Sequence, residues 1–222
     1  MSEELANTNQ NTALAPIDDA LFNSLTSSAD YFSRLQLMTS NSNISQEQNI
    51  PAGNYVVIKT KQAVKDIGKE IDVLVCGIRF KAMRINGDNI ISIYNPSNPE
   101  FNKIKEESTI KDSGCLCGPE FLVWIPDTKE FATLFCANRS HKSVAPNIRA
   151  AMTDGSPGPV TLKSNFVKKQ QYRWFAPVVT GCATPFEMPT SEALIENIDK
   201  FNHPKDSEIE AASEGEQSNR AR

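Results

Sequence analysis

The sequence predicts a mostly β protein, folded as an OB-type antiparallel barrel with one short helix and disordered acidic ends; a β-sandwich is the alternative. Two observations support this fold class. Short runs rich in Val, Ile, Phe and Tyr alternate with turn residues through residues 51–185, a pattern typical of barrels and sandwiches. One helical pattern interrupts these runs before the last hairpin, which suits an OB-type barrel.

The N-terminal segment, residues 1–28, is expected to be a flexible arm that precedes the folded domain. Residues 1–28 are rich in Asn, Thr, Ser and Ala, a composition that buries too little apolar surface to offset the entropy of ordering. Residues 31–38 are more apolar and are expected to form a first strand, followed by a polar loop over residues 39–49. We place the β-barrel domain, which we call the body, at residues 29–189. A short helix with a disordered acidic tail follows at residues 190–222.

The first half of the body contains three strand signals. Residues 54–59 form a β-branched run, and residues 71–85 form a longer one in which Gly77 indicates a bulge or bend. The Asn-Gly pair that begins at Asn86 is a strong hairpin signal, and it connects the longer run to residues 90–94.

The second half of the body completes the expected order. Its elements are a charged loop over residues 102–113, a hairpin of residues 120–126 and 130–136, a helix over residues 143–152, a hairpin of residues 160–167 and 172–179, and a helix over residues 191–201. The first helix follows from the i, i+4, i+8 spacing of Val144, Ile148 and Met152, with Pro146 in its first turn.

Charge is distributed unevenly along the chain. Residues 51–185 contain 18 Lys and Arg against 12 Asp and Glu, a net of +6. Residues 1–50 and residues 186–222 each carry a net of −5, which gives −4 for the whole chain. A basic body between acidic ends favours a polyanionic partner, although this charge also occurs in domains that bind no nucleic acid.

Several functional classes are disfavoured by what the sequence lacks. It has two histidines, and it contains no phosphate-binding loop, no Gly-x-Ser-x-Gly and no His-Glu-x-x-His motif. We therefore expect no enzymatic activity and no cofactor. The chain has no membrane-length apolar run, begins without the features of a secretory signal, and carries an odd number of cysteines, five. These features favour the cytoplasm.

A structural zinc site is the alternative chemistry. Cys115, Cys117, Cys136 and His141 supply ligand types that zinc prefers, and they would meet if the hairpin between them bends back. Two features weigh against the site. Cys-x-Cys in extended backbone is less usual than Cys-x-x-Cys, and Cys136 continues a strand pattern as a core residue would.

Basic and aromatic residues concentrate in the last hairpin and in the earlier strand pair of residues 71–85 and 90–94. Such a mixture holds single-stranded nucleic acid, because cations follow the phosphates while aromatic faces stack on bases. The residues expected to contact nucleic acid are Arg79, Lys81, Arg84, Tyr94, Lys163, Lys168, Lys169, Tyr172, Arg173 and Trp174.

The two aromatic residues of the last hairpin have a competing interpretation. Tyr172 and Trp174 are two residues apart in a strand and are expected to face the same side. That side either contacts a ligand or packs into the core.

Two stretches carry a resemblance to a known family. The segments GCLCGPEFLVWIP at residues 114–126 and YRWFAPVVTGCATP at residues 172–185 resemble single-stranded DNA-binding proteins encoded by bacteriophages, over residues 31–189. The resemblance implies an OB-type fold that coats DNA without catalysis or cofactor, with little sequence preference, during replication or recombination in the host cytoplasm. Replication proteins are then expected partners of the acidic tail. The alternative function is a viral or cellular structural or protein-interaction module, with or without zinc.

Overall fold

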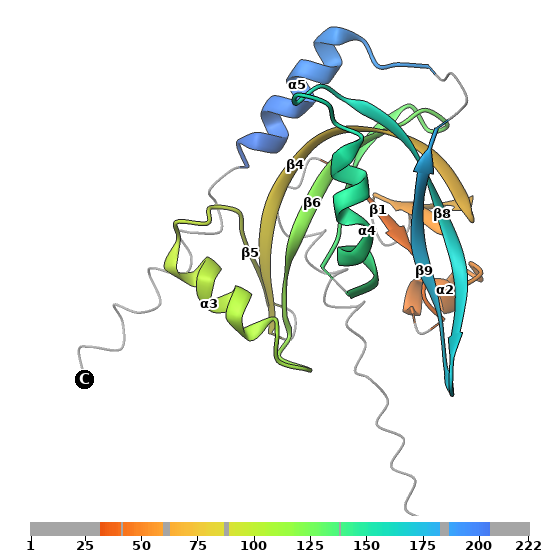
Figure 1. Ribbon diagram of the computed structural model, residues 1–222, viewed down its shortest axis with the longest axis vertical. Coiled ribbons are helices and arrows are strands. Elements are labelled where there is room, and N and C mark those ends of the chain that lie inside the picture. Colours follow the sequence, from red (N-terminus) through yellow and green to blue (C-terminus); the bar gives the residue numbers. More distant parts are fainter. Residues whose placement is uncertain are drawn as a thin grey trace, which may run out of the picture.

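The computed structural model describes residues 32–40, 42–59, 63–86, 89–137, 139–182 and 187–204. These residues form nine strands and four helices (Figure 1). In chain order they are β1 (Ser33–Leu37), α2 (Asn43–Glu47), β2 (Tyr55–Ile58), β3 (Val64–Gly68), β4 (Glu70–Asn86), β5 (Asn89–Ile93), α3 (Pro99–Glu107), β6 (Cys115–Ile125), β7 (Glu130–Phe135), α4 (Arg139–Ala150), β8 (Gly158–Lys169), β9 (Tyr172–Gly181) and α5 (Ser191–Asn202). The protein is mostly β, as the sequence predicts. The expected arm at residues 1–28 lies outside the described residues, as does the tail from residue 205 onward.

All nine strands belong to one sheet, in the order β3-β2-β1-β7-β6-β4-β8-β9 with β5 also paired to β4. β1 and β7 run parallel, while the other paired strands run antiparallel. β3 and β9 are the two ends of this order and do not pair with each other within the described residues. The sheet is therefore open and mixed, and neither the closed antiparallel barrel nor a two-sheet sandwich is observed.

β4 is the longest strand, with 17 residues, and it organises the sheet. β6 pairs along one edge of β4, while the other edge pairs with β8 at its beginning and with β5 at its end. The pairing with β6 shifts register between Val75 and Gly77, which confirms the irregularity predicted at this glycine. Figure 1 shows β4 and β6 as long curved strands, and a bulge bends and twists a strand in this way.

The larger core lies between the concave face of the sheet and α4. Val144, Ala145 and Ile148 of α4 are buried against strand residues such as Val73 and Phe121. The helix begins four residues before its predicted start, so Pro146 lies inside it rather than in its first turn. Pro146 lies on the exposed side of α4. Because proline has no N–H to donate, one carbonyl group of the preceding turn lacks its helical hydrogen bond, and water can donate to it instead.

A second core covers the opposite face of the sheet. Phe201 of α5 is fully buried with Leu74, Leu122 and Trp124, and Leu194 packs against the same cluster. Thr190 caps this helix by accepting a hydrogen bond from the Ala193 amide. The helix predicted at residues 191–201 is confirmed, and it packs onto the body.

α3 occupies part of the stretch that the sequence predicts to be a charged loop. Asn98 caps the helix by accepting from the Glu100 amide at 3.0 Å, and Pro99 follows as its first residue. Phe101 and Ile104, three residues apart, are buried against the ends of β4, β5 and β6. Lys103, Lys105 and Glu106 are exposed. The many charges of this stretch make it resemble a loop in the sequence, although it contains the cap and the apolar stripe that define a helix.

Two smaller elements also differ from the sequence prediction. α2 forms within the expected loop at residues 39–49, and Ser42 caps it. β3 extends the sheet with a run in which Lys65 and Asp66 are exposed, so it lacks the apolar signal of the other strands. No helix in the described part of the chain is long and apolar enough to cross a membrane.

Candidate nucleic-acid interface

The residues predicted to contact nucleic acid fall into two groups. The body group is Arg79, Lys81, Arg84 and Tyr94, which lie on β4 and just after β5. The hairpin group is Lys163, Lys168, Lys169, Tyr172, Arg173 and Trp174, which lie on β8 and β9. β8 pairs with the beginning of β4, Glu70 opposite Lys163, and its hairpin continues away from the rest of that strand. The hairpin tip and Arg84 are therefore at opposite ends of β4, and the structure does not bring the two groups together.

Arg79 belongs to a buried ion cluster. Its side chain is 11% exposed, and its Nε and Nη2 atoms lie 2.7 and 2.6 Å from Oε2 of Glu120, which is 3% exposed. The guanidinium also lies 3.9 Å from the ring centroid of Tyr94 and 4.2 Å from that of Phe201. A cation between two rings and a carboxylate is held by cation–π and ionic contacts at once. Arg79 therefore fixes α5 to the sheet.

Lys81 and Tyr94 are part of the same cluster. The ammonium of Lys81 lies 3.6 Å from Oε1 of Glu120, and the side chain is 9% exposed. It also lies 5.2 Å from the centroid of the Tyr94 ring. Because buried charges are stable only when paired, these contacts are structural, and the cluster presents little free charge to a ligand.

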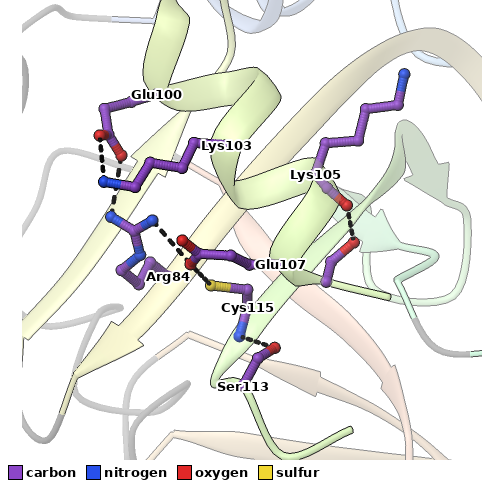
Figure 2. A network of polar contacts seen from close by, with 8 residues as sticks. Arg84, Glu100, Lys103, Lys105, Glu107, Ser113 and Cys115 are labelled. Atoms are coloured by element: carbon purple, nitrogen blue, oxygen red, sulfur yellow. Dashed lines mark hydrogen bonds and ion pairs between the residues drawn. The ribbon is translucent and has the colours of Figure 1, made fainter. Parts of the chain in front are cut away.

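Arg84 is engaged by the acidic face of α3 (Figure 2). Its Nη1 donates to Oε2 of Glu100 and its Nη2 to Oε2 of Glu107, each at 2.9 Å. The Cys115 thiol donates to the same Glu107 oxygen at 3.1 Å. The hydrogen bonds from Cys115 and Arg84 lower the pKa of Glu107, while burial and the Glu107 carboxylate raise the pKa of Cys115. This network fastens α3 to β4 and β6.

The hairpin of β8 and β9 is held to the body at its base. Phe175 packs directly on the backbone of Gly53, where a Cβ would lie 2.6 and 2.8 Å from two atoms of the ring. The Tyr55 hydroxyl donates to the Lys163 carbonyl at 3.3 Å. Lys163 itself forms an ion pair with Glu70 at 2.7 Å. Residues at the base therefore serve the fold.

The tip of this hairpin, which we define as Phe166 to Trp174, projects beyond those contacts (Figure 1). Lys169 pairs with Tyr172 across a two-residue turn in which Gln170 has a φ of 55°, as hairpin turns of this length require. Tyr172 is 62% exposed and Trp174 36% exposed. Because side chains alternate along a strand, both rings lie on one face of β9.

The tip is strongly basic. Residues 158–182 contain four basic side chains and no acidic ones. Lys168, Lys169 and Arg173 are exposed, and within the described residues none of them has an ion-pair partner. Three free cations beside two exposed rings are the combination that holds phosphates and bases of single strands.

One aromatic residue of the tip is absent from the sequence prediction. Phe166 is 58% exposed and stacks at a tilt on Phe175, with ring centroids 5.4 Å apart. Its position in an apolar strand pattern suggests a core residue. The signal that distinguishes it is its place only two residues before the paired lysines at the turn, where a hairpin has left the body.

The four residues of the zinc alternative do not form a site. Within the described residues, no group of three or more His, Cys, Asp or Glu is arranged to hold a metal ion. Cys136 is fully buried in the larger core, and burial raises its pKa to about 12. Cys115 donates to Glu107, and burial raises the pKa of Cys117. His141 lies at the start of α4, where burial lowers its pKa to about 4.

Comparison of the chain with protein-family models, with curated proteins and with solved structures finds no match.

Proposed function

We propose that the protein binds single-stranded DNA with little sequence preference, and that the tip of the β8–β9 hairpin is its contact surface. One observation carries this proposal: the tip combines exposed Tyr172 and Trp174 with three cations that have no ion-pair partner among the described residues. The hairpin itself contains no acidic residue, so the positive charge at its tip attracts phosphate. Base–ring stacking is tolerant of sequence, because every base has a π-face.

The spacing of the two rings supports the same proposal. Tyr172 and Trp174 are separated by two residues of one strand, which corresponds to about 7 Å along β9. Stacked bases are spaced by about 3.4 Å, so one base fits between the two rings. Neighbouring Lys169 lies on the same face, opposite Tyr172, and in this proposal its ammonium group pairs with the phosphate.

The proposed role is to coat DNA, without catalysis or cofactor, during replication or recombination in the cytoplasm, including that of a phage-infected host. This role does not require the closed OB-type barrel that the sequence predicts. A two-stranded ribbon that projects from an open sheet presents cations and rings equally well. The body group has no direct part in this proposal, because Arg79, Lys81 and Arg84 are engaged by carboxylates.

The salt dependence of binding tests the contribution of the cations. Each neutralised phosphate of a single strand contributes about −0.7 to the slope of log K against log salt, so the three cations of the tip give a slope no steeper than about −2. Lys169→Ala, which removes the cation opposite Tyr172, should bring the slope closer to zero by about 0.7 and weaken all sequences alike. Lys111→Ala is the control, because it removes an exposed cation from the loop after α3. Fluorescence anisotropy of a labelled oligonucleotide measures both quantities.

Loss of a ring should have a different signature. Trp174→Ala should weaken binding by about 1–3 kcal/mol per base contacted and leave the salt slope unchanged. Phe80→Ala is the matched control, because Phe80 is also exposed, by 51%, but lies on β4. DNA should also quench the fluorescence of Trp174 more than that of buried Trp124.

Two results would contradict the proposal. Tighter binding to duplex than to single strands would indicate a β-ribbon that enters the major groove instead. Absence of binding to either form would favour a protein-interaction module in which the same exposed rings contact another protein.

A further inference from the structure

The two faces of the hairpin tip carry similar chemistry. The register pairs Lys169 with Tyr172 and Lys168 with Arg173. Side chains of a cross-strand pair share a face, and successive pairs alternate between faces. Lys169, Tyr172 and Trp174 therefore form one face of the tip, which we call the outer face. Phe166, Lys168 and Arg173 form the other, which we call the inner face.

The side of the hairpin that forms the inner face is buried in the core near the base and becomes exposed toward the tip. Further along the same side of β8, Val160 and Leu162 are buried in the larger core. Phe175, also on this side, packs partly against that core and on Gly53. Phe166 is the next aromatic residue outward and is 58% exposed. More than half of Phe166 is thus presented to solvent, while its ring also contacts Phe175.

Each face therefore offers at least one ring and one cation that has no ion-pair partner within the described residues. The rings are Tyr172 and Trp174 on the outer face and Phe166 on the inner face. The cations are Lys169 on the outer face, and Lys168 and Arg173 on the inner face. A single strand that lies along one face uses only half of this surface. Two strands that diverge around the tip use both halves.

We propose that the hairpin tip is a wedge that binds the junction between single- and double-stranded DNA, with one separated strand on each face. This inference rests on the proposed function and names its preferred substrate. Phe166 to Lys169 extends roughly 10 Å at about 3.4 Å per residue, enough to reach past the first base pair of a fork. Apolar side chains inserted between bases unstack them, and rings on both faces receive the bases that are released.

The experiment compares the affinity of the protein for a DNA fork with its affinity for the separate parts of that fork. The probes are a fork with two unpaired arms, one arm as a single strand, and the paired portion as a blunt duplex. A fluorescent base analogue sits at the first base pair. The wild-type protein should bind the fork about tenfold more tightly than the single strand, because stacking on the second face adds to the first. The analogue should brighten as its base unstacks.

Variants of the inner face distinguish binding of a fork by both faces from binding of a single strand by one face. Phe166→Ala and Phe166→Leu should remove the fork preference and the brightening, but change single-strand affinity by less than about twofold. The leucine variant keeps an apolar contact with Phe175 while it removes the stacking face. Trp174→Ala should weaken fork and single strand together, and Phe80→Ala should weaken neither. Thermal melts of each variant establish that it is folded.

Equal affinity for fork and single strand would overturn the wedge and leave the proposed function intact. The same holds if the Phe166 variants weaken both probes alike. Failure of the wild-type protein to bind single strands at all would instead refute the proposed function, and the wedge with it.

Discussion

The cations of β4 and those of the hairpin tip look alike in the sequence and differ in the structure. Arg79 and Lys81 lie on the convex face of the sheet, where Glu120 of β6 is the cross-strand partner of Arg79. Lys168 lies opposite another cation, Arg173, on a ribbon without acidic residues. The partner across the strand pair therefore decides whether a cation belongs to the fold or remains free for a ligand.

This difference has an energetic counterpart. A cation that is paired in the interior cannot be removed without leaving a buried carboxylate uncompensated. A cation at an exposed tip contributes little to folding, and like charges placed opposite each other on a strand pair are mildly destabilising. The tip thus retains an unfavourable arrangement in the free protein that a bound polyanion would relieve.

The largest expected effect is on the stability of the body. Arg79→Ala should lower the free energy of unfolding by about 3–5 kcal/mol, because it leaves the carboxylate of Glu120 buried with Lys81 as its one ion-pair partner among the described residues. It also removes the contact between the guanidinium and the Phe201 ring. Urea denaturation at neutral pH measures this change. A loss below about 1 kcal/mol, the range of an exposed pair, would show that the cluster is not part of the core.

A smaller effect is expected where the hairpin meets the body. Gly53→Ala should cost about 2–4 kcal/mol, because Gly53 has a φ of 89° and its new Cβ would overlap the Phe175 ring. Gly155→Ala is the matched control: its φ is 78°, but no atom lies within 4 Å of the new Cβ. The control should show only the backbone term of about 1–2 kcal/mol. Equal losses in the two variants would mean that Phe175 moves away at little cost.

Strand and hairpin positions follow from local patterns in this sequence. The pairing of residues 160–167 with residues 172–179 is visible as two apolar runs around a polar turn, and β4 as one long β-branched run. The open sheet is not visible, because it depends on the parallel contact of β1 with β7, almost 100 residues apart. Short-range patterns carry no information on such a pairing, and they fit a barrel equally well.

The sequence predicts which strands carry the candidate site residues, but it does not predict which of these residues stay exposed. Alternation places Tyr172 and Trp174 on one face of a strand, but alternation does not reveal whether that face is covered. The same limit applies to Arg84, whose partners Glu100 and Glu107 belong to a helix that the sequence analysis assigns to a loop. Charge counts cannot separate these cases, because pairing depends on tertiary contacts.

Low pH should reduce the stability of the body, because unfolding allows His141 to take up a proton. Burial lowers its pKa to about 4, whereas the pKa in the unfolded chain is about 6.5. Between these values the unfolded chain binds more protons, so stability is full above pH 6.5 and falls as the pH approaches 4. The expected loss between pH 7 and pH 5 is roughly 2 kcal/mol.

Variants of the two histidines measure this contribution. Denaturation of the wild type and of His141→Gln at both pH values should show a smaller pH effect in the variant. His203→Gln, at the exposed end of α5, is the control and should behave as the wild type does. An unchanged pH dependence in His141→Gln would assign the acid sensitivity to other groups.

The smallest expected effect is on stability at the tip, and it completes the contrast with Arg79. Lys168→Ala and Arg173→Ala should each change the free energy of unfolding by less than about 0.5 kcal/mol, because both side chains are exposed and neither has an ion-pair partner within the described residues. A slight gain is expected, since each substitution removes repulsion between the two facing cations. Raising the salt concentration should reduce this gain by screening the repulsion. Urea denaturation at low and high salt measures both effects. A loss above about 1 kcal/mol in either variant would mean that the tip is part of the fold, and that its cations are not free for DNA.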